Sequence, residues 1–172
     1  MRITQLAYEE DYIITYTNRS MTEKDHECQT GAGWVVYWKG LERRNGREGM
    51  GELAEVYNAE MLALLRGLET VIKFQQETPN TNRRHMRIIL FADNTASVTA
   101  IMKEDPRSSQ QILQTFVETT IVFLNVNRRV TIEISWVPGH MGIEGNNRAD
   151  ALVKEATGLK LARETTTLAK IH

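Results

Sequence analysis

The sequence predicts an α/β fold: a mixed five-stranded sheet, with three antiparallel strands plus two parallel ones and helices on both faces. The first third of the chain is rich in runs of β-branched and aromatic residues that are typical of strands. From Val56 the apolar residues recur at helical spacing instead. Later, a short apolar run is followed at once by a helical pattern, which indicates a parallel unit. The expected element order is β-β-β-α-β-α-α-β-α.

Three strands are expected before residue 56, joined by hairpins as a meander. The run DYIITYT at 11–17 predicts the first strand, and GAGWVVYW at 31–38 predicts the second, paired antiparallel with the first. The polar segment 18–30 is interpreted as the connection between them. Asn45-Gly46 is a typical turn signal, and a weak third strand is expected after it, within 40–53.

The rest of the chain should alternate helices with two buried strands. Predicted in order are a helix over 56–74, a strand over 86–92, helices over 95–103 and 109–126, a strand over 131–136 and a helix over 146–157. A chain of 172 residues can bury one good core but not two, so 1–158 is expected to be a single domain. Residues 159–172 are interpreted as a C-terminal tail or frayed helix.

Composition excludes several classes of protein. No apolar run approaches the ~20 residues of a membrane span, and the N-terminus lacks the layout of a secretory signal. Cys28 is the only cysteine, which excludes an internal disulfide and a thiolate metal cluster. We therefore expect an intracellular protein, nuclear or cytoplasmic, without a membrane partner. A net charge of −1 argues against coating nucleic acid by bulk electrostatics, although local basic clusters remain.

Three carboxylates occupy positions that suit a site. Glu60 lies on the apolar stripe of its own helix, where a charge is costly unless it is paired or bound to metal. Asp93 ends a buried strand at the edge where ligands of α/β sheets collect, and Asp150 is expected in the first turn of the last helix. Each also has a plain alternative: a favourable helix dipole for Glu60 and Asp150, and a helix N-cap for Asp93 or its neighbour Asn94.

The segment 136–150 joins these carboxylates to a histidine. It predicts a strand end, a glycine-rich loop that carries His140, and the start of the helix that carries Asp150. The flanking glycines make His140 mobile and reachable. Three carboxylates form an all-oxygen set that suits Mg²⁺ or Mn²⁺, and two such ions about 4 Å apart can catalyse phosphodiester hydrolysis.

Three motifs share their order and spacing with one known family. The motif WVPGHMGIEGNNRADALVKEA at 136–156 resembles a closing strand, His loop and Asp helix. AEVYNAEMLALLRGLE at 54–69 resembles a helix with a second acidic residue, and ILFADNTASVTAI at 89–101 resembles a strand with a third. The family is that of the type 1 ribonucleases H, especially the domains found in fungal-type non-LTR retrotransposable elements. The resemblance covers about 12–157 and implies a ribonuclease H-like fold.

The resemblance also implies an activity and a set of roles. The expected reaction is endonucleolytic hydrolysis of the RNA strand of RNA/DNA hybrids with two Mg²⁺ ions, for which Mn²⁺ can substitute. The implied metal ligands and catalytic residues are Glu60, Asp93 and Asp150, with His140 assisting product release or proton transfer. The implied contacts to the hybrid are Arg19, Ser20, Asn94, Thr95 and Asn146. Contacts to backbone phosphates and 2′-hydroxyls make a weak sequence preference the expectation.

The chain departs from the family where the first strand ends. The family has Thr-Asp-Gly-Ser there, and this chain has Thr17-Asn18-Arg19-Ser20. Asn18 thus takes the position of the first catalytic and metal-binding Asp. An amide oxygen can still coordinate a cation, but it cannot offset the mutual repulsion of two ions, so metal occupancy and turnover should fall by orders of magnitude. Asn18 is either natural divergence, in a decayed or repurposed copy, or an engineered Asp→Asn.

A second departure concerns affinity for the hybrid. Some family members insert a basic, Trp-bearing helix where this chain has only residues 104–108. Binding to hybrid alone should therefore be modest, and a reverse transcriptase or another tethering partner can supply the rest.

Two rival functions stay open at this stage. One is a catalytically dead ribonuclease H-fold module that acts in nucleic-acid binding or protein assembly. The other is a different nuclease of the same broad fold, such as a transposase or resolvase, against which the motif GHMGIEGNNRAD speaks.

Overall fold

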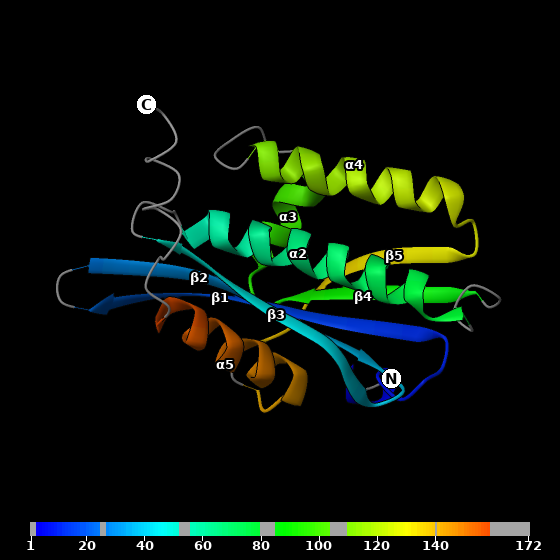
Figure 1. Cartoon of the computed structure of the whole chain (residues 1–172), viewed down its shortest axis with the longest axis horizontal. Coiled ribbons are helices and arrows are strands. Elements are labelled where there is room, and N and C mark those ends of the chain that lie inside the picture. Colours follow the sequence, from blue (N-terminus) through cyan, green and yellow to red (C-terminus); the bar gives the residue numbers. More distant parts are fainter. Residues whose placement is uncertain are drawn as a thin grey trace.

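The computed structural model describes residues 3–24, 27–51, 56–79, 85–103, 110–139 and 141–158 (Figure 1). Its elements are α1 (Ile3–Leu6), β1 (Tyr12–Lys24), β2 (Glu27–Trp38), β3 (Leu41–Gly51), α2 (Val56–Glu77), β4 (Met86–Ala92), α3 (Thr95–Lys103), α4 (Gln110–Val126), β5 (Val130–Trp136) and α5 (Glu144–Gly158). Apart from the short α1, which the sequence did not predict, the order is the predicted one.

The five strands form one mixed sheet in the order β3-β2-β1-β4-β5. β2 pairs antiparallel with both β1 and β3, whereas β4 pairs parallel with both β1 and β5. Helices α2, α3 and α4 lie on one side of the sheet and α5 lies on the other, as Figure 1 shows. The predicted fold class is therefore confirmed.

The hairpin of β1 and β2 is longer than the sequence predicted. The segment 18–30 is not a polar connection, because it continues both strands with regular pairs from Asn18↔Gly33 to Lys24↔Glu27. Cross-strand pairing satisfies the backbone groups of this extension, so its polar side chains need no buried face. The prediction of a connection was wrong because it was based on the polar side chains alone.

The predicted turn at Asn45-Gly46 is wrong. The chain turns at Lys39 and Gly40, whose φ angles of 54° and 72° suit a two-residue hairpin loop. Asn45 and Gly46 lie inside β3, and Gly46 pairs with Trp34 of β2. A Cβ at position 46 would collide with the indole of Trp34, so the glycine is explained by close side-chain approach and not by a turn.

Two cores cover the two faces of the sheet. The larger core joins the strands to α2 and α4 through residues such as Leu64, Leu68 and Phe116. The other joins the strands to α5 through Ile14, Tyr16 and Leu152. Alternate residues of β1 serve the two cores, since Ile13 belongs to the first and Ile14 to the second. This alternation also decides which side chains of β1 face α2.

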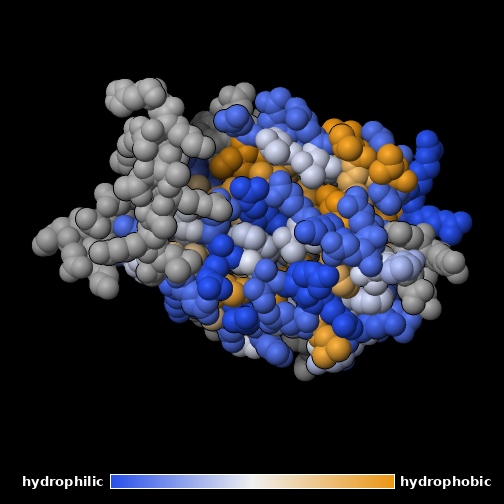
Figure 2. All heavy atoms as spheres, viewed as in Figure 1, coloured by the Kyte–Doolittle hydropathy of each residue, from blue (hydrophilic) through white to orange (hydrophobic). Residues whose placement is uncertain are grey.

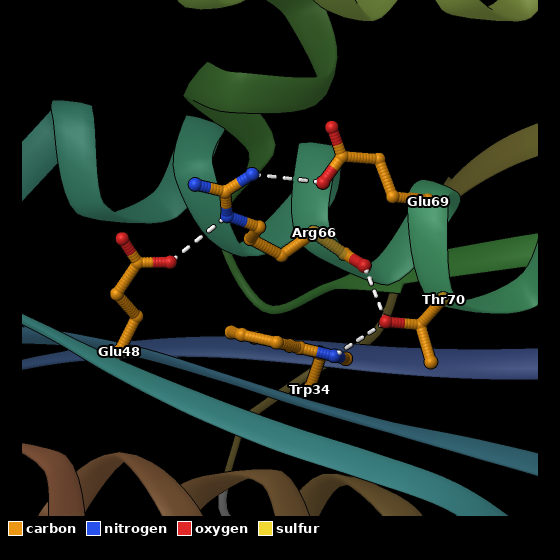
Figure 3. A network of polar contacts seen from close by, with 5 residues as sticks. All are labelled: Trp34, Glu48, Arg66, Glu69 and Thr70. Carbon is orange, nitrogen blue, oxygen red and sulfur yellow. Dashed lines mark hydrogen bonds and ion pairs between the residues drawn. The ribbon is translucent and has the colours of Figure 1, made fainter.

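A polar network fixes α2 against β2 and β3 (Figure 3). The Arg66 guanidinium bridges Glu48 of β3 and Glu69 of its own helix, each at 2.9 Å, and these contacts raise the pKa of Arg66. Trp34 Nε1 donates to Thr70 Oγ1 at 2.8 Å, and Thr70 Oγ1 donates to the Arg66 carbonyl at 2.7 Å. The network holds the orientation of the helix that carries Glu60.

The surface shown in Figure 2 is mostly hydrophilic, with an apolar area over the end of α4 that leads into β5. The exposed apolar residues of that part of α4 are Ile121, Val122 and Val126. Among the described helices, none is long and apolar enough to cross a membrane.

Candidate active site

Strand register places Asn18 and Asp93 next to one another. The parallel pairing of β1 with β4 ends at Thr17↔Ala92, so the next residues are Asn18, still within β1, and Asp93, directly after β4. Thr17 Oγ1 closes this end by donating to the Phe91 carbonyl at 3.1 Å. Asn18 is buried, with 5% of its surface exposed. The carboxyl ends of parallel strands are where open α/β sheets collect ligands.

Helix α5, which lies on the face of the sheet opposite to α2, places Asp150 near Asn18 and Asp93. Gly33, the β2 partner of Asn18, lies so close to α5 that a Cβ there would be 2.8 Å from both the Ala149 carbonyl and the Val153 nitrogen. The helix begins at Glu144, earlier than predicted, so Asp150 lies in its second turn and Glu144 is the acidic residue of the first turn. Asp150 is therefore not explained by the helix dipole.

Glu60 is a buried carboxylate, with 1% of its surface exposed, as its place on the apolar stripe predicted. Its Oε2 lies 3.6 Å from Nε of Arg19, a residue of β1. Burial and the negative charge of Asp93 raise the pKa of Glu60 to about 7, against the opposing effects of Asn94, Arg19 and Ser97. The ion pair with Arg19 on the neighbouring strand offsets part of the cost of burying this carboxylate, but burial and Asp93 outweigh it.

This raised pKa predicts a pH-dependent stability. Because the pKa of Glu60 is higher in the folded chain than the ordinary 4.5, protonation favours folding; the contribution is complete below about pH 4.5 and is lost as pH rises through 7. Replacing Glu60→Gln should stabilise the chain at pH 8 by up to about 3 kcal/mol and change little at pH 4.5. Denaturant unfolding of both proteins across this range measures the difference. Glu133→Gln, at an exposed position, is the control, and parallel curves for Glu60→Gln and the parent would contradict the assignment.

A cavity of about 390 Å³ lies beside Asn18, Asp93 and Asp150. Six of the site residues predicted from the sequence line it: Asn18, Arg19, Ser20, Asp93, Asn146 and Asp150. Met21, Gly139 and Asn147 complete the lining. Three other nominated residues, Glu60, Asn94 and Thr95, are not part of its lining. His140 lies outside the described residues. The lining thus combines two carboxylates and three amides with Arg19, and it comes from β1, α5 and the segments that follow β4 and β5.

Asn94 acts as a helix cap in this structure. Its Oδ1 accepts a hydrogen bond from the Ala96 backbone nitrogen at 2.8 Å, which is the geometry of an N-cap on α3. Thr95, the next residue, is exposed. Asn146 is buried and faces the cavity, so it is the better placed of the nominated amides to meet a ligand.

The sequence did not point to Trp136, Ser97 or Lys154. Trp136 is 47% exposed, and its Nε1 donates to the Asp93 carbonyl at 3.1 Å. It ends the edge strand β5, where little packs over its ring. Ser97 is fully buried, and its side chain lowers the pKa of Glu60. Lys154 forms an ion pair with Asp150 at 2.6 Å. The helical spacing of Asp150 and Lys154 was the available signal for the last pair.

Two divalent ions do not fit the side chains as they are arranged. Within the described ranges, no three carboxylate, histidine or cysteine side chains gather as a cation site requires. Asn18 Oδ1 accepts the Arg19 backbone N–H at 2.7 Å, Lys154 pairs with Asp150, and the Arg19 guanidinium pairs with Glu60. Oxygens of Asn18, Asp150 and Glu60 that were expected to bind metal therefore face donors or cations of the protein itself.

Comparisons with known proteins agree with the fold. A family model described as RNase H matches residues 10–158. RNase H1 from the halophilic archaeon Halobacterium salinarum is 21% identical, with a TM-score of 0.60 over 86% of this chain and 98% of that one. LC11-RNase H1, a metagenomic protein from compost, was solved in complex with RNA/DNA hybrid; it is 22% identical, with a TM-score of 0.61 over 85% and 96%. No curated protein matches the sequence.

Proposed function

Because this chain belongs to the RNase H family, we propose that it binds RNA/DNA hybrids at the cavity beside Asn18 and that its hydrolysis of the RNA strand is impaired or lost. The observation that carries the proposal is the pair Asn18 and Arg19, which lie on β1 just past its pairing with β4, beside Asp93. A relative of the same fold was solved with a hybrid bound, which supports the substrate class. Residues 1–158 are proposed to form a single domain; residues 159–172, proposed as a C-terminal tail or frayed helix, lie outside the described residues.

The residues of the cavity suit recognition of a nucleic-acid backbone. Asn18, Ser20 and Asn146 line it with groups that can donate hydrogen bonds to phosphate oxygens and 2′-hydroxyls. These contacts carry little base information, so the proposed binding is independent of sequence. His140 and Thr95 are proposed to contact the same ligand from the neighbouring loop and from the start of α3.

The catalytic part of the proposal concerns divalent ions. Members of the family generally use divalent ions. We propose Mg²⁺, with Mn²⁺ as substitute, for hydrolysis by a chain with Asp at position 18. The proposed ligands are Glu60, Asp93, Asp150 and the residue at position 18. Such ions would activate water and stabilise the leaving oxygen. In this chain the amide at position 18 removes a negative charge that two ions need, so we assign no hydrolytic step to the residues present.

We further propose that the domain comes from a retrotransposable element and works while tethered to a reverse transcriptase or a similar partner. Helix α3 ends at Lys103 and α4 begins at Gln110, which leaves no room for an inserted basic helix between them. At a net charge of −1, the chain has little general attraction for nucleic acid. A tether would supply the local concentration that affinity does not.

Binding and cleavage of a labelled hybrid test the proposal. The chain should bind hybrid weakly, losing affinity as salt rises, and should cleave it feebly with Mg²⁺ or Mn²⁺. Asn18→Asp restores the missing carboxylate and should raise cleavage roughly tenfold, with binding little changed. Double-stranded DNA of the same sequence is the control ligand.

Two results would redirect this proposal. Cleavage by the unchanged chain at the rate of Asn18→Asp would show that position 18 is not the first ligand. Inert variants that still bind hybrid would favour the second candidate, a binding or assembly module. The ion pair of Arg19 with Glu60 is the observation that favours this candidate, because it occupies a carboxylate needed for catalysis.

A further inference from the structure

Arg19 faces α2 because of its place on β1. Side chains of a strand alternate between faces, and Thr15 and Thr17 both approach Gly67 of α2. Arg19 continues this row and reaches Glu60, with 3.6 Å between Nε and Oε2. The sequence nominated Arg19 as a contact to nucleic acid, but the structure joins it to a buried carboxylate.

Glu60 needs a positive neighbour. Both of its carboxylate oxygens are buried; Asn94 and Ser97 approach them as donors and lower the pKa of Glu60, but neither makes a hydrogen bond of standard geometry. An ionised carboxylate in such a place is unfavourable unless a cation or a metal ion compensates it. Arg19 is the only basic residue that the structure pairs with Glu60 within its described part.

Arg19 lines the cavity, and its partner Glu60 does not. The Arg19 side chain is 35% exposed, whereas that of Glu60 is buried. A cation that entered beside Asp93 and Asp150 would therefore meet a guanidinium where it needs a carboxylate. Compared with an Asp-Gly sequence at 18–19, the Asn-Arg sequence makes the site less negative by two charges, one from each residue.

We propose that Arg19 is a built-in counter-cation of Glu60, which takes the place of a divalent ion and excludes such ions from the site. The chain then keeps its fold and its buried carboxylate without metal. This inference deepens the proposed function, since it concerns the same site and rests on it for the site's identity. Its readout is metal binding by the free protein, so it can succeed or fail independently of hybrid cleavage.

Calorimetric titration with Mn²⁺ in the absence of nucleic acid tests the proposal. The unchanged chain and Asn18→Asp should both bind Mn²⁺ weakly, because the guanidinium remains. Arg19→Gln should bind about tenfold more tightly, and the combination with Asn18→Asp about a hundredfold more tightly. Saturating Mg²⁺ should raise the midpoint of thermal unfolding of the Arg19→Gln proteins only. NaCl added to the same ionic strength as the Mg²⁺ is the control.

Further variants separate charge from structure. Arg19→Lys keeps the charge and should still exclude Mn²⁺, whereas Arg19→Gly should behave as Arg19→Gln does. Arg47→Gln is the matched control, because Arg47 is a half-exposed strand arginine in an ion pair with Glu155 on α5; it should bind Mn²⁺ as the parent does. Circular dichroism verifies folding of each variant.

Two results would overturn the proposal. One is equal Mn²⁺ affinity in the unchanged chain and Arg19→Gln. The other is a full gain in affinity from Asn18→Asp alone, with Arg19 in place. If Arg19→Gln gains Mn²⁺ affinity but no variant binds or cleaves hybrid, the counter-cation role stands and the proposed function falls.

Discussion

The double variant Asn18→Asp, Arg19→Gly should cleave RNA/DNA hybrid at least about a hundredfold faster than the unchanged chain with Mg²⁺. The first change returns a carboxylate to β1 where its pairing with β4 ends, beside Asp93. The second removes the guanidinium that lies 3.6 Å from Glu60 and frees that carboxylate. Since both act on the same ions, the gain should exceed the product of the single gains.

Single-turnover cleavage of a labelled hybrid by the four chains of this cycle measures the effect. Adding Asp93→Asn to the double variant is the control, and it should return cleavage to the starting level if the restored site acts. A double variant that binds hybrid but stays inert would mean that the chain has lost more than these two residues. Equal rates in Asn18→Asp and the double variant would mean that Arg19 does not obstruct the site.

Gly33→Ala should lower the free energy of unfolding by about 2–3 kcal/mol, and with it the thermal midpoint by roughly 5–10 °C. The new Cβ would lie 2.8 Å from two backbone atoms of α5, the Ala149 carbonyl oxygen and the Val153 nitrogen. Backbone in a packed helix cannot move aside as a flexible side chain can. The helix must shift as a unit and carry Asp150 away from Asn18.

Denaturant unfolding of Gly33→Ala and the parent measures this cost. Gly139→Ala is the matched control, because a Cβ there would meet only an ordinary contact, 3.9 Å from Asp93 Oδ2, and it should change the free energy of unfolding by less than about 1 kcal/mol. Parent-like stability of Gly33→Ala would show that α5 lies further from β2 than in this structure.

Much of the fold was predictable from local patterns. The helical period from Val56 identified α2, which buries one regular stripe, and the apolar run at 86–92 identified β4, whose alternate residues pack into both cores. The β1–β2 hairpin was underestimated because its outer half is polar and is recognised only by pairing. Asn45-Gly46 was misinterpreted because a glycine at this position suits either a tight turn or the close approach of an indole. The contact with Trp34, which distinguishes the two, is not visible in the local sequence.

The candidate site was predictable in its parts but not in its connections. Glu60 was recognised because a charge on an apolar stripe is visible in one helix. The partner of Glu60 was not, since Arg19 and Glu60 are 41 positions apart in the sequence and meet only when β1 packs under α2. The exposure of Trp136 likewise depends on β5 being an edge strand, which follows from the strand order.

The split in the pairing of β1 has a consequence for how such a domain can change over time. β1 loses its parallel neighbour after Thr17 but continues beside β2, so a hollow opens at Asn18 from the course of the backbone alone. Substituting the side chains around this hollow alters its charge without closing it. A lineage can therefore lose the hydrolytic activity and keep the cavity. The cavity is then available for a different function.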